Sequence, residues 1–97
     1  MVRSLVERRL SHIGSRLKTL REELAVLDEQ RIQLLHEADE ARLQALVSET
    51  PMSDKAHRSA SRHVDVIERR RGELTATIVK LETTQDELLD RLVESRT

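Results

Sequence analysis

The chain has 97 residues, a formal net charge of −1 and no Phe, Tyr, Trp or Cys, and charged residues make up 36% of it. This length allows one small domain, and without cysteine neither a disulfide nor a thiolate metal site can form. Near-neutral charge and the lack of aromatic stacking platforms argue against direct nucleic-acid binding. No apolar run is long enough for a signal peptide or a membrane span, so we expect a cytoplasmic protein without membrane contact.

An apolar stripe runs along the first half of the chain in alternating steps of four and three residues. Its members are Val6, Leu10, Ile13, Leu17, Leu20, Leu24 and Leu27. This spacing aligns side chains along one narrow side of a helix and is typical of coiled coils. We therefore expect a first helix over residues 3–48.

The only proline of the chain separates this half from the next. Thr50 can cap a helix through its hydroxyl, and Pro51 suits a first helical position because its missing N–H would have no partner there. Ser53 and Asp54 offer an alternative start. We expect a turn over residues 49–52 and a second helix over residues 53–94, with Pro51 as its other candidate first residue.

The second half carries a matching stripe in the same alternation. It consists of Ala60, Val64, Ile67, Arg71, Leu74, Ile78, Leu81, Gln85, Leu88 and Leu92. Since a short connection makes neighbouring helices antiparallel, the fold class is predicted to be all-α, with two long helices in one antiparallel coiled-coil hairpin.

Further apolar residues lie off both stripes: Leu5, Ile32, Leu35, Leu43, Leu46, Val66, Val79, Leu89 and Val93. Two helices alone make a thin core, and folds of this size often gain stability by associating. We expect a homodimer that forms a four-helix bundle, or a partner helix docked along the hairpin.

Two arginines interrupt the stripes. If the chain turns near Pro51, residues whose numbers add to about 102 face each other, which places Arg31 and Arg71 at one level. Two guanidinium groups are not buried together without compensation. The compensating negative charge can come from an anion such as a phosphate, from a carboxylate of another subunit, or from Asp28, Glu29, Glu68 or Glu73.

Two interpretations of this level follow. Either the two arginines form ion pairs that fix the register of the hairpin, or they contact a ligand or a partner. Arg69 and Arg70 would extend such a contact, or they form a solvated helix face beside Glu68 and Glu73.

Catalytic and metal-binding patterns are missing from the sequence. The four histidines lack the spacing of metal ligands, and there is no Gly-rich phosphate loop or Ser/His/Asp set. We expect no metal, no cofactor and no enzymatic activity.

The tip of the hairpin offers two carboxylates, Glu49 and Asp54. An acidic tip resembles, in shape, the coiled-coil domain of Gre-type transcript-cleavage factors, which enter RNA polymerase and support a catalytic magnesium with two acidic tip residues. The glycine-containing tip motif of that family is absent here. The tip carboxylates are expected either to contact a partner or, in the case of Asp54, to cap the second helix.

The spacing Glu7-x-x-x-Ser11 resembles the opening of a motif in streptomycete anti-sigma factors that sense cyclic-di-GMP. The basic stretch at residues 67–74 is similar to one on the second helix of that family. The later Arg, Gln and Asp positions of the motif are here Gly14, Lys18 and Glu22. The resemblance implies a helical hairpin, a sigma factor as partner and cyclic-di-GMP as ligand.

The expected function is a non-enzymatic protein–protein interaction module, specifically a bacterial transcription regulator that binds a sigma factor or RNA polymerase. One alternative is a structural, self-assembling spacer. The other is a sensor of a nucleotide second messenger, which would use Arg31, Arg71 and neighbouring basic residues.

Overall fold

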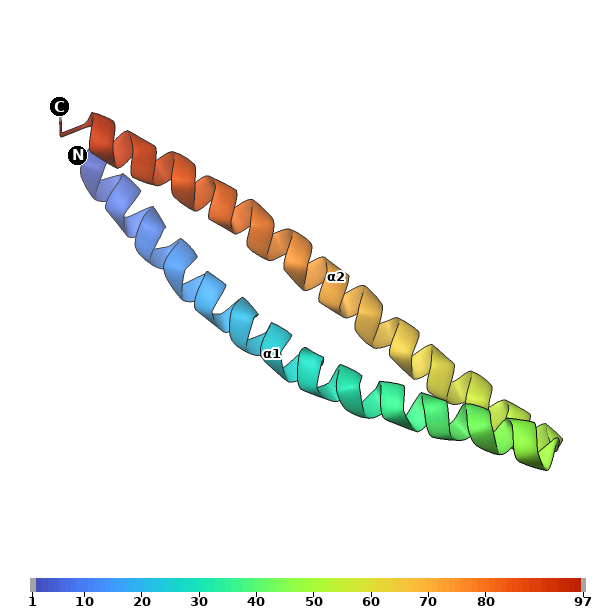
Figure 1. Cartoon of the computed structure of the whole chain (residues 1–97). Coiled ribbons are helices and arrows are strands. Elements are labelled where there is room, and N and C mark those ends of the chain that lie inside the picture. Colours follow the sequence, from blue (N-terminus) through green and yellow to red (C-terminus); the bar gives the residue numbers. More distant parts are fainter. Residues whose placement is uncertain (1, 97) are drawn as a thin grey trace. The chain divides into compact units, whose positions relative to one another are not determined.

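The computed structural model describes residues 2–96 of the chain. Two helices account for nearly all of them: α1 spans Val2–Ser48 and α2 spans Pro51–Glu94 (Figure 1). They are joined by residues 49 and 50. The predicted all-α hairpin of two long helices is confirmed.

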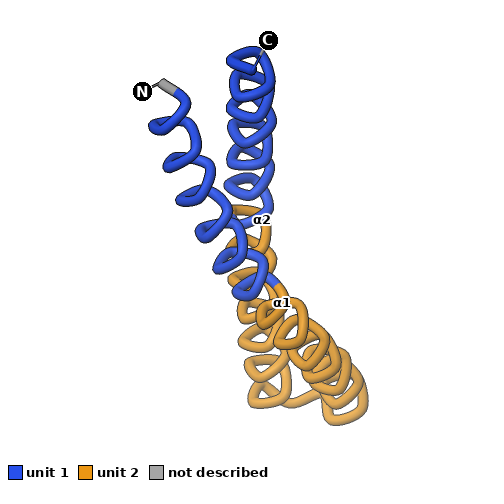
Figure 2. The backbone as a smooth tube through the Cα atoms, turned by 90° about the vertical axis from the view of Figure 1, so that its left-hand side faces the viewer, with its two compact units in different colours: residues 1–24, 74–97 blue, residues 25–73 orange. Residues whose placement is uncertain are grey.

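Contacts between residues divide the chain into two compact units, whereas the sequence suggests a single one. Unit 1 combines residues up to 24 with those from 74 onward, and unit 2 contains residues 25–73 (Figure 2). In each unit a segment of α1 packs against an antiparallel segment of α2. The division arises because a side chain in a helix pair contacts only its neighbours along the same stretch of the facing helix.

The core of unit 1 follows the predicted stripes. Leu17 is its most deeply buried residue, and Val6, Ile13, Ile78 and Leu88 are buried around it. The partly buried residues that pack against these are Leu10, Leu20, Leu24, Leu81 and Leu92. Large aliphatic side chains therefore fill this half of the seam, where the two stripes meet.

The seam of unit 2 is built from smaller side chains. On α1 the steps of four and three continue beyond Arg31 through half-buried Leu34, Ala38, Ala41, Ala45 and Ser48. Facing them on α2 are buried Ser53 and Ile67, with half-buried His57, Ala60 and Val64. Because alanine and serine fill most of the seam here, the large aliphatic residues of this part of α1 other than Leu34 lie elsewhere on the helix.

The link between the helices is held by a reciprocal cap. The Ser53 backbone N–H donates to Thr50 Oγ1 at 3.1 Å, and the Thr50 N–H donates to Ser53 Oγ at 3.3 Å. This arrangement is a capping box with serine at the third helical position, and it starts α2 at Pro51. Glu49, with φ of 49°, takes the left-handed conformation that commonly ends helices.

Candidate functional site

The two seam arginines form crossed ion pairs within unit 2. Arg31 Nε of α1 donates to Glu68 Oε1 of α2, and Arg71 Nε of α2 donates to Asp28 Oδ1 of α1 at 2.5 Å. All four side chains are half-buried. On each helix the carboxylate stands three residues before the arginine and reaches the arginine of the other helix. The pairs therefore tie α1 to α2 in one register.

Asp28 also changes the acid–base chemistry of its partner. Its hydrogen bond and its negative charge raise the pKa of Arg71. A raised pKa of Arg71 means that the protonated guanidinium is favoured in the folded chain, and that this contribution to stability is lost as the pH rises through the pKa of Arg71. A phosphate at this level would have to compete with the carboxylates that the chain itself supplies.

The other two arginines of the basic stretch are not drawn into the seam. Arg70 Nη1 lies 3.5 Å from Glu73 Oε2 on the same exposed side of α2. Arg69 is exposed. These positions agree with a solvated helix face, and they leave Arg69 accessible to a partner.

The remaining residues of the anti-sigma motif lie in unit 1. Glu7 Oε1 accepts a hydrogen bond from Arg3 Nε at 3.0 Å on the exposed side of α1. Ser11, one turn further along, is exposed. The structure thus places these two residues in a different unit from Arg31 and Arg71.

Both tip carboxylates are exposed. Glu49 lies in the link, and Asp54 lies in the first turn of α2, where the helix dipole favours a negative charge. The cap itself comes from Thr50 and Ser53, so α2 begins at Pro51 and not at residue 53, and the expected turn over residues 49–52 shortens to residues 49 and 50. Among residues 2–96 no group of three or more His, Asp or Glu side chains could hold a metal ion.

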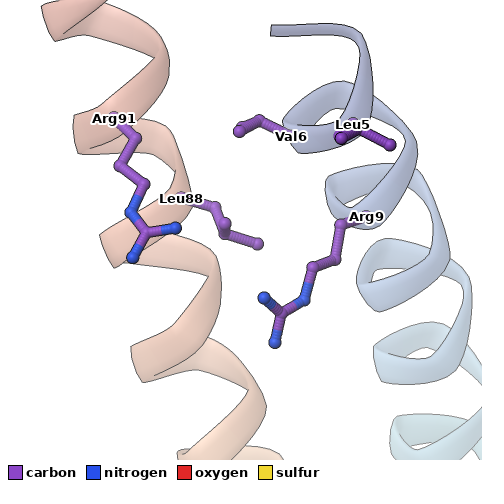
Figure 3. A pocket seen from close by; sticks show the side chains of 5 residues that line it. All are labelled: Leu5, Val6, Arg9, Leu88 and Arg91. Atoms are coloured by element: carbon purple, nitrogen blue, oxygen red, sulfur yellow. The ribbon is translucent and has the colours of Figure 1, made fainter. Parts of the chain in front are cut away.

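A small open hollow of about 190 Å³ lies between the helices of unit 1. Val6 and Leu88 form its apolar surface, with Leu5 beside them (Figure 3). Arg9 extends toward the hollow from α1 and Arg91 from α2. The hollow is lined chiefly by apolar atoms, and both arginines are exposed.

A second apolar stripe runs along α1 in unit 2, outside the seam. Ile32, Leu35, Leu43 and Leu46 are 69%, 36%, 55% and 64% exposed. With Asp39 at its centre, this outer stripe again follows steps of three and four residues. It lies on the same stretch of α1 whose seam side carries alanines. The larger apolar side chains here therefore face solvent.

The sequence pattern alone did not predict the alanine part of the seam, and it named Asp28 and Glu68 only among four candidate partners of the arginines without predicting the crossed pairing. The alanine part of the seam could have been found by continuing the steps of four and three past Arg31 and accepting small side chains. The crossed pairs have a signal as well, because Asp28 and Glu68 each stand directly after a seam position and three residues before the seam arginine. The outer stripe, by contrast, consists of residues that the sequence already places off the seam.

Comparison of the chain with protein-family models, curated proteins and solved structures gives no match. In the described part of the chain, neither helix contains a stretch that is both long and apolar enough to cross a membrane.

Proposed function

We propose that the chain is a non-enzymatic protein–protein interaction module that binds through the outer stripe of α1. The observation that supports this is the exposure of Ile32, Leu35, Leu43 and Leu46 along one side of a helix whose seam side is closed by alanines. Fully burying one such side chain contributes roughly 1.5–3 kcal/mol. A helix laid along the stripe would bury several of them at once, which is the usual chemistry of helix recognition.

The more specific proposal is a bacterial transcription regulator that acts in the cytoplasm on a sigma factor or RNA polymerase. Its support is the resemblance of the Glu7-x-x-x-Ser11 spacing and of the basic stretch to anti-sigma factors that are themselves helical hairpins. The two-helix architecture of the chain agrees with that resemblance. In this proposal the protein acts by covering a surface of its partner.

The test is affinity capture from a lysate of the organism that encodes the chain, followed by mass spectrometry. The baits are the unaltered chain, the stripe variant Leu43→Glu with Leu46→Glu, and the matched control Val66→Glu on α2, whose valine is 67% exposed. We expect the unaltered chain and the control to retain a sigma factor or a polymerase subunit, and the stripe variant to lose it. Retention of the same partner by all three baits would contradict binding through the stripe.

A self-associating spacer is the second candidate. In unit 1, Val79, Leu89 and Val93 are 54%, 44% and 63% exposed, and their spacing places them along one side of α2. Sedimentation equilibrium of the purified chain measures this association directly. A stable homodimer that Leu89→Glu converts to monomer would support the spacer and the expected four-helix bundle.

A further inference from the structure

We infer that the partner segment held by the outer stripe is an amphipathic helix with basic flanks, and that one of its lysines or arginines pairs with Asp39. The inference deepens the proposed function and rests on it in one respect, that the chain binds a protein through this stripe. It does not depend on the partner being a sigma factor or a polymerase subunit.

Charge is the first argument for a basic partner. Residues 25–49 contain six carboxylates against two arginines, and one of each is already paired across the seam, Arg31 with Glu68 and Asp28 with Arg71. Glu29, Asp39 and Glu40 are exposed on or beside the stripe, together with Arg42, and Glu40 Oε1 lies 3.1 Å from His36 Nε2 on the same helix. A cationic helix would be attracted to this surface and an anionic helix repelled.

The position of Asp39 is the second argument. It occupies the central place of the stripe, four residues after Leu35 and four before Leu43, where an apolar residue would complete the pattern. The structure gives Asp39 no ion pair within residues 2–96. A partner that covers the stripe must leave this carboxylate in water or supply a cation, because an unpaired charge at an interface opposes binding.

The same residue argues against a second copy of the chain as the occupant. A two-fold pairing of the stripe with itself in antiparallel register places equivalent residues across from each other at its centre. That arrangement would bring Asp39 of one copy against Asp39 of the other, and the surrounding carboxylates would add to the repulsion. Charge complementarity therefore favours a different protein.

The length of the stripe fits a short helical segment. From Ile32 to Leu46 the helix rises about 21 Å, which is roughly four turns. A segment of about two heptads with apolar residues at two positions in each heptad would match it. The stripe therefore predicts one class of partner, an amphipathic helix with lysine or arginine on both sides of its apolar face.

The test uses two labelled helical peptides of about two heptads with the same leucine stripe. One carries lysine at every flanking position and the other glutamate. Fluorescence anisotropy measures the binding of each to the intact chain. We expect the lysine peptide to bind at least about tenfold more tightly, with a smaller preference at about 0.5 M salt because screening weakens exposed charges. Equal affinity, or a preference for the glutamate peptide, would overturn the inference.

Variants of the chain locate the contact. The change Leu43→Ala with Leu46→Ala should weaken binding of the lysine peptide at least about tenfold, whereas Val66→Ala should leave it unchanged. Replacing Asp39 and Glu40 by lysine should shift the preference toward the glutamate peptide. Circular dichroism verifies that each variant keeps its helices. An equal loss of binding in the Val66 variant would place the contact outside the stripe.

Failure of this inference can be distinguished from failure of the proposed function. If capture from lysate depends on the stripe but the lysine peptide does not bind, protein binding stands and the basic helix is wrong. If the lysine peptide binds but no sigma factor or polymerase subunit is captured, the inference stands without that partner. If the purified chain sediments as an oligomer and altering Leu43 and Leu46 reduces its mass, the stripe binds a second copy of the chain. That result would overturn the inference.

Discussion

At the scale of single residues, the crossed pairs explain how two arginines occupy a coiled-coil seam. Arg31 and Arg71 each extend to a carboxylate at the edge of the opposite helix, so their charged ends stay partly in water. Half-exposed ion pairs contribute little net stability, because water already solvates the separated charges. Their main effect is on register, since a shift of one helix along the other would separate both pairs.

The first prediction concerns these arginines. Replacing both by leucine should preserve or raise the helicity and the melting temperature, because leucine suits a seam position and the freed carboxylates can be hydrated. Thermal unfolding followed by circular dichroism measures the change, with the exposed Arg69→Leu as a control. A large destabilisation of the double variant would show that the pairs are needed for folding and not only for register or function.

At the scale of elements, α1 and α2 differ in how apolar residues are distributed around them. In unit 2, α1 has a seam of small side chains and an outer stripe of large ones. The corresponding part of α2, residues 51–73, exposes only Met52 and Val66 among its large apolar side chains. A helix that is apolar on two sides is typical of a position between two neighbours. The chain itself supplies only one of these neighbours to α1 in unit 2.

The second prediction concerns the start of α2. Thr50→Ala removes the hydroxyl that accepts the Ser53 N–H, and this change should lower the free energy of unfolding by about 1 kcal/mol. Thr50→Ser keeps the oxygen and should restore most of the loss. Urea unfolding of the three proteins makes the comparison. Equal stability of the alanine and threonine proteins would mean that the cap does not determine where α2 begins.

The third prediction concerns the two glycines within helices. A Cβ atom added at Gly14 or at Gly72 would meet no atom within 4 Å apart from its chain neighbours and the backbone of its own helix, so alanine fits at either position. Each change to alanine should raise the free energy of unfolding by about 1 kcal/mol, the difference in helix propensity.

The glycine variants also separate two explanations for these positions. If the glycines are merely tolerated, the stabilised variants should capture partners as well as the unaltered chain does. Loss of capture by Gly14→Ala or Gly72→Ala, despite the gain in stability, would indicate that a partner approaches the backbone there.

At the scale of the whole molecule, the sequence predicts the architecture because a single pattern repeats through it. Alternation of four and three residues from Val6 to Leu27, and from Ala60 to Leu92, determines which side of each helix is buried. The division into two units was not predicted, because periodicity describes one helix and not the contacts it makes. The crossed pairing of Asp28 and Glu68 depends on side-chain reach across the seam. From the spacing alone, any of four carboxylates could have paired with the two arginines of the seam.

The most direct measurement is the reactivity of a thiol placed on the outer stripe. The sequence contains no cysteine, so Leu43→Cys provides a single probe there, with Val66→Cys as an exposed control and Leu17→Cys as a buried one. In the purified chain, maleimide should label positions 43 and 66 at similar rates at every protein concentration, and position 17 far more slowly. In cells of the organism that encodes the chain, position 43 alone should become protected. Equal labelling of positions 43 and 66 in cells would contradict the account, because the outer stripe would then remain uncovered.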